Sequence, residues 1–336
     1  MLLLTAAMAI SPVAQTTAQD AATFYKMNTI RFIVGAGAGG GYDTFARVLT
    51  PHLRKAIGAN IVIENVPGAG GLVALNRNYS ARPDGLQIMI VNGVAAASTQ
   101  ILNMDNVHYD LAKFEILGIG NAEPWVWLLG PNSAHKTVAN VVASKEKLSW
   151  GGSGVISGMS DGAAMLCDVL SLDCKIVIGY KGSNDVALAL QRGEMDAMYV
   201  SDMPANNYVT AGQAKPVASI TRQRIPRFFP GLPTIFESVK LTSEQEWWID
   251  FRITLDALGR ILVTTPGVPK DRVVYLQSVV KQVLNDPAVI AEAAKAKLFI
   301  DYSDPHQSLS MIQQVVSSLT PEQHQRLKNV VTKKYY

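Results

Sequence analysis

Two glycine-rich turns near the start of the chain constrain its fold more than any other feature. The first, from Gly35 to Gly41, follows the apolar run 30–34, and the second, from Gly68 to Gly71, follows the run 61–64. A helical pattern begins directly after each turn. A strand that passes through a glycine turn into a helix is the start of a β–α–β unit. Because the N–H groups at such a helix N-terminus have no intrahelical partner, they can bind an anion.

The rest of the chain continues this alternation of strands and helices. Short runs rich in valine and isoleucine predict strands at 30–35, 61–64, 86–91, 114–119, 126–129, 148–150, 175–178, 197–200, 216–220 and 260–263. Helical patterns predict helices at 43–57, 72–81, 138–144, 162–170, 185–192, 270–284, 288–296 and 305–318. This order predicts an α/β fold with parallel sheets and crossover helices.

The length of the chain, 336 residues, predicts about two domains, and its 48% of hydrophobic residues is enough for real cores. Short crossings expected at Asn121 to Pro124 and at 219–227 make the middle segment an inserted domain. We therefore expect a first domain of residues 23–123 and 221–336 and a second domain of residues 124–220. Ligands of such folds bind beyond the carboxyl ends of the strands, so the cleft between the domains is the expected site.

The charge distribution excludes several classes of function. The formal net charge is +3, and the 30 basic residues are not gathered in a block, so no nucleic-acid partner is expected. The five histidines are scattered, and the histidines and cysteines show no metal-ligand spacing. We therefore expect neither a metal site nor a cofactor.

The N-terminal segment resembles a secretory signal. Residues 1–10 are apolar, Ser11 and Pro12 interrupt the pattern, and small residues follow up to Ala18. These features predict a cleaved signal peptide at 1–22 and export to the periplasm of a Gram-negative type of cell. The first basic residue is Lys26, so the positive start of a signal peptide is missing. A buried N-terminal helix remains the alternative.

The two cysteines, Cys167 and Cys174, lie seven positions apart. This separation is too long for a redox motif of the C-x-x-C kind. In an exported protein the pair can form a local disulfide between a helix end and the next strand. Two free buried thiols are the alternative.

The first glycine turn is also compatible with an enzyme. Gly35, Gly37 and Gly40 fit the dinucleotide fingerprint, and Glu64 follows at the distance expected of a ribose-binding acid. A dinucleotide-binding oxidoreductase is therefore the alternative function. A serine hydrolase has less support, because G-x-S-x-G is absent. A second glycine turn is more than a dinucleotide site requires, and it favours two half-sites that face one ligand.

Several motifs carry a resemblance to a known family. They are Val34 to Arg47, Val62 to Gly71, Ala81 to Gly85, Gly151 to Ser160, Tyr180 to Gly182, Arg192 to Met198, Pro230 to Thr234 and Thr264 to Pro269. In this order they resemble the Bug-type periplasmic receptors of tripartite tricarboxylate transporters. The resemblance implies a type II periplasmic binding protein. We expect the protein to be a monomer and not an enzyme. Its two lobes would each have a mainly parallel sheet flanked by helices. They would close on a small organic carboxylate and deliver it to membrane transporter subunits.

The resemblance also implies the ligand-binding residues. In the first lobe these are Gly39, Gly40, Gly41, Tyr42, Ala69, Gly70 and Asn92, whose loops would hold a carboxylate partly through ordered water. In the second lobe they are Ser153, Gly154, Ser157 and Ser160, with Lys181 and Asp202 as further candidates. The chain departs from the family pattern at Tyr42, where threonine or serine is usual, and at Ser160 and Asp161, where histidine is frequent. We expect backbone N–H groups, rather than buried countercharges, to neutralise the ligand.

Overall fold

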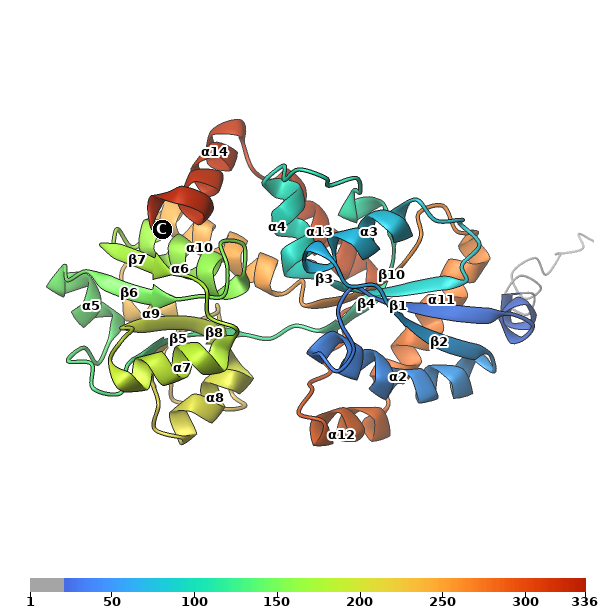
Figure 1. Cartoon of the computed structure of the whole chain (residues 1–336), viewed down its shortest axis with the longest axis horizontal. Coiled ribbons are helices and arrows are strands. Elements are labelled where there is room, and N and C mark those ends of the chain that lie inside the picture. Colours follow the sequence, from blue (N-terminus) through green and yellow to red (C-terminus); the bar gives the residue numbers. More distant parts are fainter. Residues whose placement is uncertain (1–20) are drawn as a thin grey trace, which may run out of the picture.

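The structure, a computed structural model, describes residues 21–336 and consists of two α/β lobes (Figure 1). The predicted signal peptide, residues 1–22, lies almost wholly outside the described residues. The first sheet has the order β2 (Asn60–Asn65), β1 (Thr29–Val34), β3 (Gln87–Asn92), β10 (Arg260–Thr264), β4 (Glu115–Asn121). The second has the order β7 (Cys174–Val177), β6 (Leu148–Gly151), β8 (Ala197–Ser201), β5 (Trp125–Leu129), β9 (Lys215–Ile220).

The strand directions follow the same plan in both sheets. β10 is antiparallel to both of its neighbours, and so is β5. The other four strands of each sheet run in one direction. The predicted α/β fold with mainly parallel sheets is therefore confirmed. The reversed strand in each sheet is the one that the chain enters directly after crossing from the other lobe.

Helices flank both sheets. Those around the first sheet are α2 (Gly41–Ile57), α3 (Leu72–Tyr79), α4 (Gly93–Ile101), α11 (Lys270–Leu284), α12 (Pro287–Lys295) and α13 (Pro305–Ser317). The remaining helices are α5 (Val138–Ser144), α6 (Gly158–Val169), α7 (Ser183–Arg192), α8 (Asp202–Thr210), α9 (Ile235–Ser238), α10 (Ser243–Asp256) and α14 (Pro321–Asn329). Short helical turns lie at η1 (Ala69–Gly71), η2 (Leu111–Lys113) and η3 (Val330–Lys334).

Strand β1 shows why the predicted runs are apolar throughout. Phe32 packs in one buried cluster with Phe45 of α2 and Leu276 of α11. Its neighbour Ile33 packs in another cluster with Ala97 of α4. Successive strand residues point to opposite faces, and helices cover both faces of this sheet. The strand is therefore a continuous hydrophobic run rather than an alternating one.

All ten predicted strands form, and so do all eight predicted helices, within a few residues of the expected bounds. The helices α4, α8, α9, α10 and α14 were not predicted. Helix α4 consists mostly of small residues, and α8 carries a proline in its first turn, so neither shows a clear helical period. Helix α10 begins with a capping box of Thr242 and Gln245, a sequence signal that was available.

The two lobes are joined by short segments. Residues 122–124 connect β4 to β5, and residues 257–259 connect α10 to β10. Helix α10 lies between the lobes, in contact with α6 on one side and with α4 and α13 on the other. The predicted domain limits, 23–123 with 221–336 and 124–220, remain a proposal.

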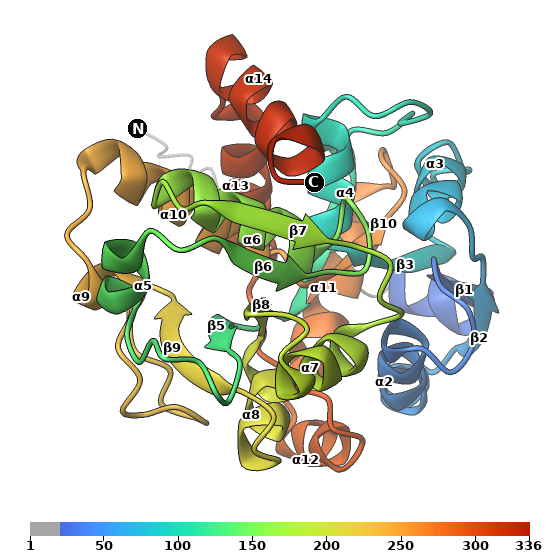
Figure 2. The same cartoon turned by 60° about the vertical axis from the view of Figure 1, so that its left-hand side comes forward.

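The C-terminal segment returns to the second lobe after α13. The helical turn η3 packs against α6, and the N–H of Ile176 in β7 donates to the carbonyl of Tyr335 at 2.6 Å. Figures 1 and 2 show the C-terminus beside α6 and β7. Tyr336 donates from its hydroxyl to the carbonyl of Val155 at 3.1 Å. The last residues therefore pack on the second lobe, whereas helix α13, earlier in the chain, packs on the first.

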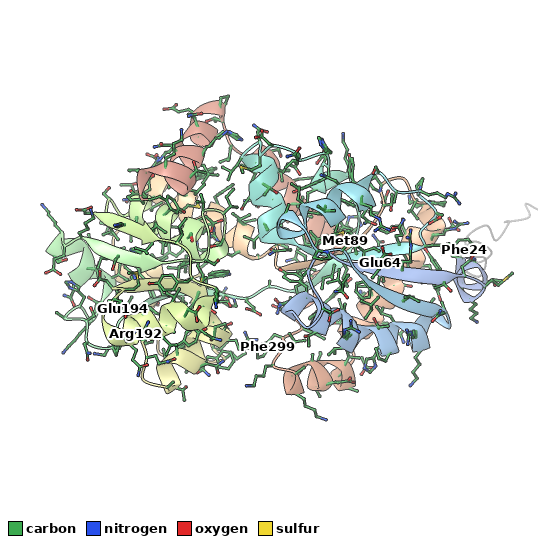
Figure 3. The ribbon with its side chains drawn as sticks, in the orientation of Figure 1. Phe24, Glu64, Met89, Arg192, Glu194 and Phe299 are labelled. Carbon is green, nitrogen blue, oxygen red and sulfur yellow. A yellow bond between two sulfur atoms is a disulfide. The ribbon has the colours of Figure 1, made fainter. Side chains whose placement is uncertain are left out.

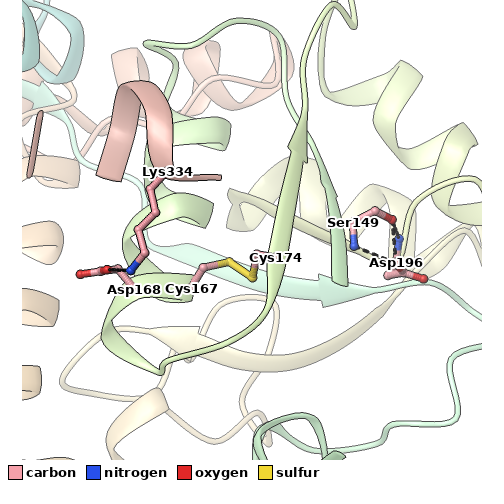
Figure 4. Close-up of a disulfide and its surroundings, with 6 residues drawn as sticks. All are labelled: Ser149, Cys167, Asp168, Cys174, Asp196 and Lys334. Carbon is pink, nitrogen blue, oxygen red and sulfur yellow. Dashed lines mark hydrogen bonds and ion pairs between the residues drawn. A yellow bond between two sulfur atoms is a disulfide. The ribbon is translucent and has the colours of Figure 1, made fainter. Parts of the chain in front are cut away.

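Cys167, near the end of α6, and Cys174, at the start of β7, form a disulfide with a Cα–Cα distance of 6.2 Å (Figure 4). The neighbouring carboxylate of Asp168 accepts hydrogen bonds from Arg326 at 2.9 Å and from Lys334 at 2.6 Å. The disulfide and these ion pairs lie side by side. The disulfide joins β7 to the end of α6, and the ion pairs join the C-terminal segment to the same end.

Candidate functional site

A cavity of about 350 Å³ lies between the lobes. Its wall consists of Tyr42, Gly70, Asn92, Val94, Ala95, Asn121, Glu123, Trp125, Ile156, Ser157, Gly158, Asp161, Asp256, Gly259 and Arg260. A second cavity of about 310 Å³ shares Tyr42, Gly70 and Asn92 with it and extends between the two glycine loops. Both volumes are in the range of small-molecule sites. The expected position of the site, between the lobes, is where the cavities lie.

The first glycine loop is held in place by the buried side chain of Asp43. Its carboxylate accepts hydrogen bonds from the Gly39 N–H at 2.8 Å, from Arg47 Nε at 2.7 Å and from Asn65 Nδ2 at 3.0 Å. The hydrogen bond from Arg47 is the largest cause that holds the pKa of Asp43 at about 2, and the bonds from Gly39 and Asn65 add to it. The Gly39 N–H therefore donates within the loop rather than to a ligand.

The N–H groups of Gly41 and Tyr42, unlike that of Gly39, are not used within the loop. The first hydrogen bond of helix α2 joins the Thr44 N–H to the Gly40 carbonyl at 2.8 Å. The N–H groups of Gly41 and Tyr42 precede this bond, so they are among the unpaired donors of the helix N-terminus. Tyr42 also lies on the wall of both cavities. Gly41 and Tyr42 are therefore the donors of this loop best placed to meet an anion.

Replacing Asp43 with alanine is expected to lower the free energy of unfolding by about 2 kcal/mol at neutral pH, because charge-assisted bonds to a buried carboxylate are lost. The depressed pKa means that this stabilisation is complete above the ordinary value of 3.8 and is lost as the pH falls through about 2. Urea unfolding across this range should show the difference between wild type and variant vanish at the acid end. Asp185→Ala, at a half-buried carboxylate that accepts one loop N–H, is the control. An equal loss in both variants would contradict the role of Asp43.

The second glycine loop presents bare backbone to the cavities. Ala69, Gly70 and Gly71 have positive φ angles of 46°, 67° and 100°. This conformation is costly for Ala69, which carries a Cβ, and the Gly71 N–H bonded to the Gly68 carbonyl at 2.9 Å holds the turn closed. Gly70 lies on the wall of both cavities. The loop therefore brings its main chain against the space where a ligand would sit.

The second lobe meets the cavity at the N-terminus of helix α6. Ser157 caps this helix, and its Oγ accepts from the Ser160 N–H at 3.4 Å. The hydroxyls of Ser157 and Ser160 are 3.0 Å apart. Ser157 and Gly158 lie on the cavity wall, whereas Ser160 is fully buried behind them. A helix N-terminus from each lobe thus contributes to the site.

A buried charge network forms part of the same wall. Arg252 of α10 donates from Nη1 to Asp161 at 2.9 Å and from Nε to Asp256 at 3.0 Å. The Tyr199 hydroxyl donates to Asp256 at 2.5 Å. Burial raises the pKa of Asp161 above its ordinary value and that of Asp256 to about 6, although Arg252 opposes both shifts. The network joins α10 to α6 and borders the cavity with two carboxyl groups.

Arg260 and Glu123 also lie on the wall. Arg260 is the first residue of β10, and Glu123 belongs to the crossing between β4 and β5. Their side chains are 3.5 Å apart, between Nη1 and Oε1, and each is mostly buried. Sequence reasoning missed both residues. The available signals were an arginine that opens an otherwise apolar strand and a charged residue within an expected crossing.

The predicted binding residues are distributed unevenly around the site. Tyr42, Gly70, Asn92 and Ser157 line the main cavity, and Gly39, Gly40, Gly41 and Ala69 lie in the loops next to it. Ser153, Gly154, Ser160, Lys181 and Asp202 are not among the lining residues.

Two of the residues outside the cavity have partners of their own. Asp202 is fully buried and accepts two hydrogen bonds from Arg227, at 2.9 and 2.7 Å. Lys181 is exposed, and its backbone N–H donates to Asp185 at 3.2 Å. The Asp202 carboxylate is therefore occupied by an ion pair within the protein.

The acid required by the dinucleotide interpretation is also occupied. Glu64 forms ion pairs with Arg77 at 2.8 Å and with Arg31 at 3.6 Å. Figure 3 shows Glu64 in the first lobe. A ribose hydroxyl would have to compete with two guanidinium groups for this carboxylate. The oxidoreductase alternative is therefore not favoured.

Within residues 21–336, no group of three or more histidine, cysteine, aspartate or glutamate side chains is arranged to hold a metal ion. No helix in this range is long and apolar enough to cross a membrane.

Comparison with known proteins identifies the family. Residues 45–327 match the family model described as the tripartite tricarboxylate transporter family receptor. The chain belongs to this receptor family. A UPF0065 protein of Bordetella pertussis is 26% identical over 266 residues, which cover 78% of each chain. The family resemblance of the sequence motifs is thereby confirmed.

Two solved structures share the fold of this chain. A TctC solute-binding protein from Polaromonas superposes with a TM-score of 0.72 at 20% identity, covering 91% of this chain and 98% of that one. MatC from Rhodopseudomonas palustris, solved with bound malate, gives a TM-score of 0.64 at 22% identity, covering 90% and 98%. The predicted type II periplasmic binding protein fold is confirmed.

Proposed function

We propose that this receptor captures a small organic carboxylate between its two lobes in the periplasm and delivers it to the membrane subunits of its transporter. One observation carries the proposal. The cavity of about 350 Å³ is bordered by a glycine-loop helix N-terminus of the first lobe and by the N-terminus of α6 in the second. Unpaired amides at two helix N-termini suit an anion. MatC, which shares the fold, was solved with bound malate and so supports a small carboxylate as the class of ligand.

In this proposal the carboxylate meets the N–H groups of Gly41 and Tyr42, with Ala69, Gly70 and Asn92 beside it. Ser157 contributes from the second lobe. The lobes rotate about the short crossings 122–124, 257–259 and 318–320, so closure brings the two half-sites together around the ligand. The protein works as a monomer, needs no cofactor and performs no chemistry on the ligand.

A thermal-shift screen against mono-, di- and tricarboxylates, aromatic acids and NAD(P) tests this function. We expect carboxylates to raise the melting temperature and nucleotides to leave it unchanged, because ligands stabilise the state that binds them. Titration calorimetry of each stabilising acid then gives its affinity. Stabilisation by NAD(P) alone would reject the receptor function in favour of the oxidoreductase.

Filling the cavity should abolish binding without unfolding the protein. Ala95 lies on the wall within helix α4, so Ala95→Trp is expected to weaken carboxylate binding by at least about tenfold. Ala288→Trp, at an exposed position of α12, is the control and should bind like wild type. Equal affinities of both variants would place the ligand outside this cavity.

A further inference from the structure

Arg227 lies against two aromatic rings. Its guanidinium carbon is 3.5 Å from the centroid of the Phe299 ring and 4.8 Å from that of the Phe228 ring. The two ring centroids are 5.8 Å apart, and the ring planes meet at 87°. A guanidinium within about 6 Å of an aromatic centroid is attracted by the negative face of the ring. The contact with Phe299 is the shorter of the two.

The two partners of this shorter contact belong to different lobes. Phe229, two positions after Arg227, lies in a buried cluster with residues of β5 and β8 in the second sheet. Leu298 lies in a buried cluster of the first lobe, and Ile300 packs against it. Phe299 lies between these two residues, but its ring faces Arg227. Figure 3 shows Phe299 between the lobes. The contact therefore joins one lobe to the other.

Both partners are tied to the crossing between β4 and β5. The fully buried carboxylate of Asp202 accepts two hydrogen bonds from Arg227 Nη2, at 2.9 and 2.7 Å. The Asp202 N–H donates to the carbonyl of Pro124, at the end of the crossing, at 2.9 Å. Asn121 Nδ2, at its start, donates to the Phe299 carbonyl at 2.8 Å. The contact therefore fixes the angle at which the lobes leave this crossing.

The lobes held at this angle border one cavity. Tyr42 of the first lobe and Ser157 of the second lie on its wall, whereas Arg227, Phe299 and Asp202 are not among the lining residues. The contact is thus made in an arrangement in which the two half-sites face the same space. An interaction that stabilises one arrangement raises its population, and with it the apparent affinity of any ligand that binds this arrangement.

We propose that Arg227 and Phe299 form an inter-lobe latch that keeps the two half-sites in the arrangement that binds ligand. Both are then positioning residues for ligand capture. The inference rests on the proposed function and adds the residues that control the geometry of the lobes. Asp202, predicted to bind the ligand, instead orients the cation of the latch. Because the latch touches no ligand, its effect is the same for every acid that the cleft accepts.

Replacing Phe299 with leucine tests the latch, because it removes the ring and keeps an apolar side chain. Small-angle X-ray scattering of the ligand-free variant is expected to give a larger radius of gyration than wild type, since the lobes separate more readily. Titration calorimetry with acetate, malate, citrate and benzoate is expected to show affinities lower by about three- to tenfold for each acid that wild type binds. Phe299→Tyr keeps the ring and should retain the wild-type radius and affinities.

A double-substitution cycle separates the latch from the packing of each residue alone. Arg227→Lys keeps a positive charge for Asp202 but loses the planar guanidinium that stacks on the ring. The change is expected to weaken binding in the wild-type background and to add little to the loss in Phe299→Leu. If the two losses add in full, the contact between the residues is not their cause, and the latch is overturned.

Phe24 supplies a matched control. The guanidinium carbon of Arg272 is also 3.5 Å from the Phe24 ring centroid, but Phe24 packs on the first lobe and Arg272 belongs to α11 of the same lobe. Figure 3 shows Phe24 at the far end of this lobe from Phe299. Phe24→Leu therefore removes the same kind of contact within one lobe. It should leave the radius of gyration and the affinities unchanged, and ligand-free melting temperatures show whether any change follows unfolding.

The outcomes separate the latch from the proposed function. An unchanged radius of gyration or unchanged affinities in Phe299→Leu overturn the latch and leave the proposed function standing, and so do equal changes in Phe24→Leu. If wild type binds none of the four acids, the proposed function is contradicted. The scattering of the ligand-free variants then still decides whether Phe299 holds the lobes together.

Discussion

Replacing Arg252 with methionine is expected to lower the free energy of unfolding by about 3–5 kcal/mol, the largest effect of any single change considered for this protein. Arg252 is 2% exposed and pairs with Asp161 and Asp256, which are 4% and 5% exposed. Methionine fills much of the volume but leaves two buried carboxyl groups without a cation. Denaturant unfolding, followed by tryptophan fluorescence, measures the loss.

The pH dependence identifies the cause of this loss. Burial raises the pKa of both carboxyl groups above the ordinary value of 3.8, that of Asp256 to about 6, so the folded state binds protons more readily than the unfolded state. The penalty in the variant should therefore shrink as the pH falls from about 7 to about 4. Changing Asp161 and Asp256 to asparagine together with Arg252→Met should recover much of the stability. If the loss of stability stays the same at every pH and is not reduced by the two asparagine substitutions, packing rather than charge is responsible.

Replacing Gly259 with alanine is expected to cost about 3 kcal/mol and to impair ligand binding, because the new Cβ meets the opposite crossing. An ideal Cβ at this position would lie 1.7 Å from the carbonyl oxygen of Asn121, and φ is +29°. The two crossings would have to separate. Since Arg260 follows Gly259 and bonds to Asn121, the separation would also displace the guanidinium from the cleft.

Gly231→Ala is the matched control for this variant. A Cβ on Gly231 would meet nothing within 4 Å, so its stability and affinity should equal those of wild type. Thermal unfolding and calorimetric titration with the best ligand report the two effects separately. If Gly259→Ala failed to fold, the loss of stability would be larger than expected but would have the same cause. If the Gly259→Ala variant had the stability and affinity of wild type, the crossings would separate without cost.

Much of the fold could be predicted because its signals are local. The apolar run before Gly35 and the helical period after Gly41 fix a strand, a turn and a helix without reference to the rest of the chain. Helix α4 could not be found in this way, because its small residues suit a close approach of α10 and α13 rather than a helical period. Its formation depends on contacts between segments that lie far apart in the sequence.

The candidate site also has a part that is local in the sequence and a part that depends on contacts between distant segments. The amides of Gly41 and Tyr42 follow from one stretch of sequence, so the sequence favoured recognition by backbone alone. Arg260 and Glu123 lie 137 positions apart and meet because both border the crossings between the lobes. The structure therefore adds a countercharge beside the loop, where the sequence predicted none. Asp202, predicted to bind ligand, instead pairs with Arg227 from a segment that only folding brings near.

The position of the last residues determines how motion in this receptor can be observed. Tyr336 is anchored to Val155, in the loop that leads to the cap of α6, whereas α13 packs on β4 of the first sheet. A fluorophore on the C-terminus would therefore travel with the second lobe. A partner dye on exposed Met27, beside β1, would stay with the first. The distance between the two dyes would report opening and closing in solution while the cleft stayed free of any label.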